Sequence, residues 1–180
     1  MSIVYTIISE LPQFGKGIII AIELLFGLLL LGLIIGLIIA ILEVFADLPI
    51  RFTVSSIRKV MWAVPQLALL SLVFYLPFDL PPMSAAIIAL GICSAAFQSQ
   101  IFRGAIQAIK PGQVEAARAM GLGKFRIVQF IVIPQMVKLA IGPWTNEFSS
   151  EVKDTSLAYV IGVVEIMRRA KYIIAYTYGH

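Results

Sequence analysis

Charged residues are scarce in this chain of 180 amino acids. Only 13% of its residues are Asp, Glu, Lys or Arg, whereas 60% are hydrophobic. A soluble domain carries about 25% charged residues, so the composition excludes an ordinary water-soluble protein and indicates a membrane protein. The net charge of +4 does not indicate nucleic-acid binding, because the basic residues cluster beside apolar segments, where they set membrane topology.

The residues needed for most catalytic and metal sites are also nearly absent. The one cysteine, Cys93, lies in an apolar segment and reads as a small packed residue, so no disulfide framework or cysteine metal site can form. The one histidine, His180, ends the sequence, which excludes a Ser-His-Asp triad and a histidine metal cluster. No phosphate-binding loop of the G-x-x-x-x-G-K-[ST] type occurs. We therefore expect no catalytic residue, no metal and no cofactor on this chain.

The sequence is rich in long apolar segments. A bilayer core is crossed by about 20 apolar residues. We predict one transmembrane domain of residues 1–180 with helical spans at about 18–45, 60–76, 83–102 and 127–148. Glu23 and Glu43 bracket the uncharged run of the first span and are expected near the two membrane interfaces.

Several residues inside these spans leave alternatives open. Gly32 and Gly36 form a small-xxx-small pair that either lets another helix approach closely or arises by chance in a glycine-rich helix. Pro65 either is tolerated in the first turns of the second span or breaks it. The polar residues of the third span either line a cavity or, as we favour, hydrogen-bond to neighbouring helices; they include Ser94, Gln98 and Ser99. The fourth span is expected to be interrupted at Pro134 and at Gly142-Pro143.

The basic residues predict the orientation of the chain. They lie between the first two spans and after the third, at Arg51, Arg58, Lys59, Arg103, Lys110, Arg118, Lys124 and Arg126, whereas the loop between spans two and three has none. The positive-inside rule then places the segment 103–126 in the cytoplasm and the N-terminus outside.

A short polar segment, Gly112–Gly121, stands between two of these spans. Its alanines favour a helix over Val114–Met120, and Glu115 is expected in the first turn, where a carboxylate complements the helix dipole. Gly121 is expected to end the helix. An amphipathic helix on the lipid surface is the main structural alternative, and the spans on both sides argue against a second alternative, a DNA-binding helix-turn-helix. A thin alanine-rich helix fits a groove on a soluble partner.

The same segment resembles a known motif. Glu115-Ala116-Ala117, then Gly121, then Ile131-Val132-Ile133-Pro134 keeps the spacing of the "EAA" loop of ABC importer permeases, with Ile133 in place of leucine. The resemblance implies a coupling helix that docks on a cytoplasmic ATPase subunit, and it implies that ATP is used by that partner. The residues implied to couple are Gly112, Glu115, Ala116, Ala117, Ala119 and Gly121.

Further motifs narrow the resemblance. Phe102-Arg103-Gly104, Pro134-Gln135, Asn146 and Lys153–Leu157 are similar to the permeases for polar amino acids such as histidine, glutamine, glutamate and arginine. This implies the all-α transmembrane bundle of type I ABC importer permeases, a second permease subunit that is identical or related, and an extracytoplasmic amino-acid-binding protein.

The sequence departs from the pattern of these permeases in two places. Ala63-Val64-Pro65 keeps only the proline of an Arg-Gly-Thr-Pro-like motif, and a final span is lacking, either through truncation or in a reduced bundle.

Charged and polar residues after the fourth span form a second candidate site. We expect Lys153 and Asp154 to pair beside the solute pathway, because a zwitterionic amino acid needs complementary charges; a structural salt bridge is the alternative. The proposed pathway residues are Asn146, Lys153, Asp154, Thr155, Ser156 and Glu165. Rival functions are a small helical membrane protein without an ATPase, such as a channel or assembly factor, and an ABC permease for another solute.

Overall fold

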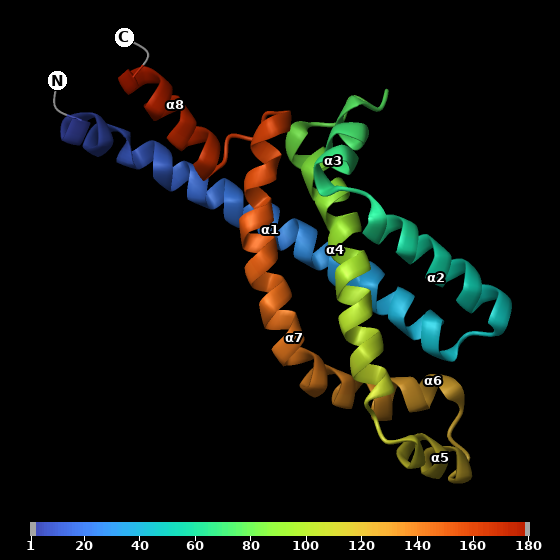
Figure 1. Cartoon of the computed structure of the whole chain (residues 1–180). Coiled ribbons are helices and arrows are strands. Elements are labelled where there is room, and N and C mark those ends of the chain that lie inside the picture. The colour runs from blue at the N-terminus through green and yellow to red at the C-terminus, as the bar shows by residue number, and fades with distance from the viewer. Residues whose placement is uncertain (1–2, 179–180) are drawn as a thin grey trace. The chain divides into compact units, whose positions relative to one another are not determined.

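A computed structural model describes residues 3–178 of the chain. Every regular element in this part is helical, as predicted for the all-α class (Figure 1). The elements are α1 (Ile3–Phe45), α2 (Leu48–Ala63), α3 (Gln66–Tyr75), α4 (Pro82–Gln107), α5 (Pro111–Ala119), α6 (Lys124–Ile127), the π-helix η1 (Val128–Val132), α7 (Ile133–Asp154), the 3-10 helix η2 (Thr155–Ile161) and α8 (Ile166–Tyr178).

The chain divides into two compact units, each with its own apolar core. The first combines Met1–Leu31, Val64–Ile92 and Ser150–His180, and the second combines Gly32–Ala63 and Cys93–Ser149. In the first unit, alanines of α4 let the helices pack closely around larger side chains. This core includes Leu24, Leu28, Leu70, Ala85, Ala86, Ala89, Leu90 and Ala158.

The core of the second unit joins the short helix α5 to longer ones. Phe102, Ala105 and Ile106 contribute from α4, and Ala117 contributes from α5. The remaining buried members are Ala40, Ile109, Ile127, Val132, Met136 and Ala140. Because apolar burial stabilises roughly in proportion to area, this core fixes α5 on the end of α4.

Three helical segments are long and apolar enough to cross a membrane. They are Glu10–Phe45, Pro82–Gln107 and Lys124–Ile161, and the pair α2 and α3 counts as a fourth if a broken span is accepted. The predicted range 60–76 therefore covers the end of α2, a break and α3. The break lies at Pro65, which precedes the first residue of α3. A proline there has no N–H to donate, so it ends the helical hydrogen-bond ladder.

The expected interruptions of the fourth span are wrong. α7 continues through both Pro134 and Pro143. Just before Pro134 the backbone forms the wider π-helical turn of η1. Such bulges accommodate local irregularity inside a continuous helix, and prolines are tolerated in membrane helices. The segment 124–161 is consequently one long helical stretch.

The glycine pair of the first span makes the predicted close helix contact. A Cβ added at Gly36 would lie 3.0 Å from the carbonyl oxygen of Ala95 and 3.1 Å from the backbone nitrogen of Ser99. A Cβ at Gly32 would lie 2.6 Å from Nε2 of Gln98. α1 and α4 therefore touch almost backbone to backbone within the second unit, which confirms the small-xxx-small interpretation.

We predict that Gly36→Ala destabilises the protein. The new methyl group meets backbone atoms, so the two helices must separate, and overpacking of this kind costs about 1–3 kcal/mol. Gly15→Ala, in the same helix with nothing within 4 Å of the added Cβ, is the matched control and should be neutral or stabilising by about 0.5–1 kcal/mol. Thermal melting of both purified variants tests this; equal melting temperatures would contradict the close contact.

Candidate functional site

The helix α5 is the centre of the EAA-like segment. It begins at Pro111, in the first helical position, where a proline is preset for helical φ and its missing N–H costs nothing. The start lies three residues before the predicted one, at Val114. Glu115 is therefore beyond the first turn, and no acidic residue lies in that turn. The expected interaction of Glu115 with the helix dipole is wrong.

The end of α5 is the glycine stop that the sequence predicts. Gly121 has φ +81°, a conformation that favours glycine. The N–H of Gly121 donates to the carbonyl oxygen of Arg118 at 2.9 Å, and the N–H of Leu122 donates to that of Ala117 at 3.1 Å. These two bonds form a Schellman motif, with Leu122 packed against the core of the second unit. The turn thereby fixes the direction in which the chain leaves α5.

The implied coupling residues divide between two sides of α5. Ala117 is only 1% exposed and packs into the core. The other five, Gly112, Glu115, Ala116, Ala119 and Gly121, are exposed. Met120, at the end of the helix, is 73% exposed although it is apolar. α5 thus presents a thin, largely alanine surface with one exposed apolar side chain, which suits docking on another protein.

A groove lies beside α5 within the second unit. It has a volume of about 250 Å³ and is lined by the ends of α1 and α4 and by α5 itself. Glu115 and Arg118 supply its charged groups, and the rest of its lining is mostly apolar. The charged side chains of α5 therefore border a hollow at the end of the helices.

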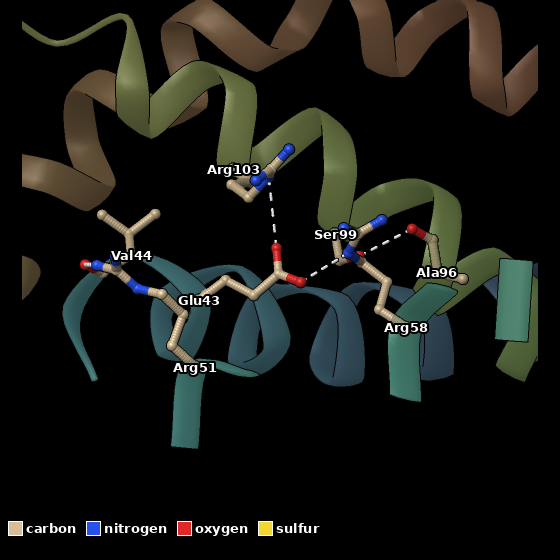
Figure 2. A network of polar contacts seen from close by, with 7 residues as sticks. All are labelled: Glu43, Val44, Arg51, Arg58, Ala96, Ser99 and Arg103. Carbon is tan, nitrogen blue, oxygen red and sulfur yellow. Dashed lines mark hydrogen bonds and ion pairs between the residues drawn. The ribbon is translucent and has the colours of Figure 1, made fainter. Parts of the chain in front are cut away.

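A buried polar cluster stands next to this region (Figure 2). Glu43 of α1 lies between Arg58 of α2 and Arg103 of α4. Its Oε1 accepts a hydrogen bond from Nε of Arg58 at 2.7 Å, and its Oε2 lies 3.4 Å from Nε of Arg103. Glu43 and Arg58 are both 6% exposed. Two ion pairs therefore join three helices of the second unit.

Sequence reasoning assigned no site role to this cluster. It treated Arg58 and Arg103 as topology signals and Glu43 as an interface residue. The sequence does place the carboxylate of Glu43 at the end of an apolar span. A charge in that position is costly unless an opposite charge pairs with it, and this cost indicates that Glu43 needs a partner. Nothing in the sequence showed which of the many basic residues would pair with it.

Among the polar residues of α4, Gln98 hydrogen-bonds to a neighbouring helix, as favoured, whereas the bonds of Ser94 and Ser99 stay within α4. Gln98 is fully buried. Its Nε2 donates to Oγ of Ser94 at 2.8 Å, and its Oε1 accepts from Nε1 of Trp144 in α7 at 3.1 Å. The Ser99 hydroxyl donates to the carbonyl oxygen of Ala96 at 2.8 Å. These bonds satisfy groups that would otherwise be unpaired in an apolar surrounding.

The predicted pairing of Lys153 with Asp154 is wrong. Asp154 instead accepts a hydrogen bond from Nε2 of Gln66 at 3.0 Å, while Lys153 is exposed and makes no ion pair with any described residue. Adjacent helical residues point in different directions, so neighbours in sequence do not face each other. The Thr155 and Ser156 hydroxyls donate to backbone carbonyl oxygens of Val152 and Lys153 at 2.8 and 2.6 Å.

Glu165 has a structural role at the start of α8. It is 0% exposed, and its carboxylate accepts hydrogen bonds from the backbone N–H groups of Met167 at 2.8 Å and Arg168 at 2.9 Å. A negative group that accepts from the first N–H groups of a helix both caps it and complements its dipole. α1 approaches this turn closely, because a Cβ at Gly17 would lie 3.1 Å from Cα of Ile166.

We predict that Glu165→Ala loosens α8 first. Loss of an N-cap costs about 0.5–2 kcal/mol, so the backbone amides of Met167 and Arg168 should exchange with deuterium faster than in the wild type. Glu115→Ala removes an exposed carboxylate from α5 and should leave exchange in α8 unchanged. Unchanged exchange in Glu165→Ala would refute the capping role.

Comparisons with known proteins give a consistent result. Residues 32–179 match the family model described as "Binding-protein-dependent transport system inner membrane component". The chain is 33% identical over 172 residues to the probable amino-acid permease protein YxeN of Bacillus subtilis, which covers 91% of this chain and 76% of that protein. It is 29% identical over 178 residues to the arginine transport system permease protein ArtQ of the same species, covering 96% and 81%.

A solved structure has a similar fold. A chain from the crystal structure of an amino acid ABC transporter with histidines superimposes with a TM-score of 0.84 at 31% identity, covering 99% of this chain and 85% of that one.

Proposed function

This chain belongs to the family of inner membrane components of binding-protein-dependent transport systems, and we propose that it forms one half of the translocation pathway of an ATP-driven importer for polar amino acids. It is a multi-pass membrane protein and the permease subunit of an amino acid importer. We also propose how the chain couples to its partners, which of its residues meet the solute and how it is oriented in the membrane.

The observation that carries the proposal is the construction of α5. The helix is held to the end of α4 through Ala117, while Glu115, Ala116 and Ala119 face outward. A rigidly mounted helix with a thin outer face can receive force from a partner and pass it to the helices behind it. We propose that a cytoplasmic ATPase subunit grips this face and supplies the free energy of uptake by hydrolysing ATP.

The remaining parts of the importer follow from this role. Two permease subunits, identical or related, would enclose the pathway, and each would dock on an ATPase subunit. Closure of the ATPase pair on nucleotide would bring the α5 helices together and switch the pathway between its two faces. The segment 103–126 would then lie in the cytoplasm and the N-terminus outside, where an amino-acid-binding protein delivers the solute.

The substrate class rests on the relatives. Their names include amino-acid and arginine transport, and the chain shares the Lys153–Leu157 motif of polar amino acid permeases. Of the six proposed pathway residues, Asn146 and Lys153 have exposed side chains and are the ones we propose to meet the amino acid. Asp154, Thr155, Ser156 and Glu165 bond to other protein groups and would act by shaping the backbone around the pathway.

Affinity purification from native membranes tests the partnership. The tagged chain in mild detergent should retain a protein with a phosphate-binding loop, and Glu115→Lys combined with Gly121→Val should release it while the chain stays folded. The isolated complex in proteoliposomes should then take up labelled arginine, glutamine or histidine on addition of ATP and a binding protein. A folded wild-type chain that retains no ATPase would overturn the proposal.

A second test concerns the turn that ends α5. Gly121→Val places a β-branched residue at φ +81°, so the Schellman turn must rearrange and α5 must change its direction. We expect ATP-driven uptake to fall by about tenfold or more, since strain of 1–3 kcal/mol is stored at such a position. Gly123→Val is the matched control, because Gly123 has φ −69° and a Cβ added there would have nothing within 4 Å. Equal uptake by both variants would contradict the role of the turn.

A further inference from the structure

We infer that Glu43 is a positioning residue that holds the end of α4 to α1 and α2 through two ion pairs of unequal strength, and that the pair with Arg103 is the one that opens during transport. The inference rests on the proposed function, because movement of α5 has meaning only if a partner drives it. Four features of the second unit carry it.

The first feature is the stiff connection between α5 and α4. Only residues 108–110 separate the two helices. The N–H of Ala108 donates to Gly104 at 3.1 Å and that of Ile109 to Ile106 at 3.2 Å, so the connection continues the hydrogen bonding of α4. Ile109 is itself buried in the core that holds Ala117. A push on α5 therefore moves the end of α4 with it.

The second feature is the position of Arg103. It lies just before the last turn of α4, four residues before the final residue Gln107, so it moves with the end of that helix. Its Nε is 3.4 Å from Oε2 of Glu43, which belongs to α1 (Figure 2). Displacement of α4 thus acts first on this carboxylate.

The third feature is the difference between the two ion pairs of Glu43. The pair of Glu43 with Arg58 is short, at 2.7 Å, and the side chains are 2% and 7% exposed respectively. The pair with Arg103 is longer, and the Arg103 side chain is 38% exposed. The facing atoms of this second pair, Nε of Arg103 and Oε2 of Glu43, are buried but share no hydrogen bond, whereas Nε of Arg58 donates one to Oε1 of Glu43. The pair of Glu43 with Arg103 therefore separates more easily than the pair of Glu43 with Arg58.

The fourth feature is that one carboxylate serves two guanidinium groups. When Arg103 withdraws, Glu43 keeps its hydrogen bond to Arg58 and is not left as a lone buried charge. When Arg103 withdraws, its own charge can be hydrated, because its side chain is partly exposed. The cluster can therefore switch between two paired arrangements, and α1 and α2 stay joined in both.

Uptake per ATP hydrolysed is the measurement that tests this role. We would reconstitute the complete complex with Arg103→Gln, and with Arg51→Gln as matched control. Arg51 is an exposed arginine of α2 that donates to the carbonyl oxygen of Val44, at the end of α1, and makes no ion pair with Glu43 (Figure 2). Both changes remove one positive charge, so effects of net charge on insertion and assembly are the same in the two variants.

The expected result is a loss of coupling without loss of the complex. Arg103→Gln should lower the number of solute molecules taken up per ATP by about fivefold or more, the scale of a typical coupling between sites, while the complex assembles and melts as the wild type does. Arg103→Lys should restore most of the ratio, because the contact uses a single nitrogen and needs a charge rather than a bidentate fork. Arg51→Gln should match the wild type.

A double variant shows whether the two residues act through each other. Glu43→Gln should lower the ratio as Arg103→Gln does, and combining the two should add little, since residues that act as one unit are not additive. If Glu43→Gln fails to assemble, the comparison of Arg103→Gln, Arg103→Lys and Arg51→Gln still decides the matter.

The inference and the proposed function fail in different ways. A wild-type complex without ATP-driven uptake would refute the proposed function. A wild-type complex that couples normally, with Arg103→Gln coupling as well as Arg51→Gln, would refute the role of Glu43 alone. Equal, parallel losses of uptake and ATP hydrolysis in Arg103→Gln would also refute it, because they indicate a merely structural contact.

Discussion

The unit that carries α5 depends on the pairing of Glu43 with Arg58. An ionised carboxylate that is 6% exposed cannot remain in an apolar surrounding unless a cation and a hydrogen-bond donor meet it there. That requirement brings α2 against α1 and leaves the second oxygen of Glu43 for Arg103 of α4. A single carboxylate thus links α1, α2 and α4.

Close packing provides the second constraint on this unit. Gly32 and Gly36 let α1 approach α4 so nearly that a methyl group would collide with backbone or polar atoms. In a bilayer, contacts of this kind matter more than in water, because apolar side chains gain little by leaving lipid. On the same stretch of α4, the buried Gln98 bonds to Ser94 within the helix and to Trp144 of α7, which joins α7 to this contact region. The short helix α5 then rests on a frame that can transmit movement.

The sequence predicted those features that depend on local chemistry. Composition and apolar run length indicated a helical membrane protein, the position of Gly121 indicated the end of α5, and the spacing of small residues indicated the contact at Gly32 and Gly36. The sequence was a poorer guide to where a helix begins, whether prolines interrupt it, and which neighbouring side chains pair. The start of α5, the continuity of α7 through its prolines and the pairing of Lys153 with Asp154 all came out differently, because backbone geometry overrides residue preference there.

What the sequence by itself determined is therefore the class of the protein, the identity of its EAA-like segment and the family to which it belongs, since these rest on composition and on spacing within short stretches. Only the tertiary structure decided which charges meet. Glu43 bonds to Arg58 across 15 positions and Gln66 to Asp154 across 88, and each carboxylate had several possible donors along the chain. The choice among them depends on which helix faces come together, and a linear pattern does not record it.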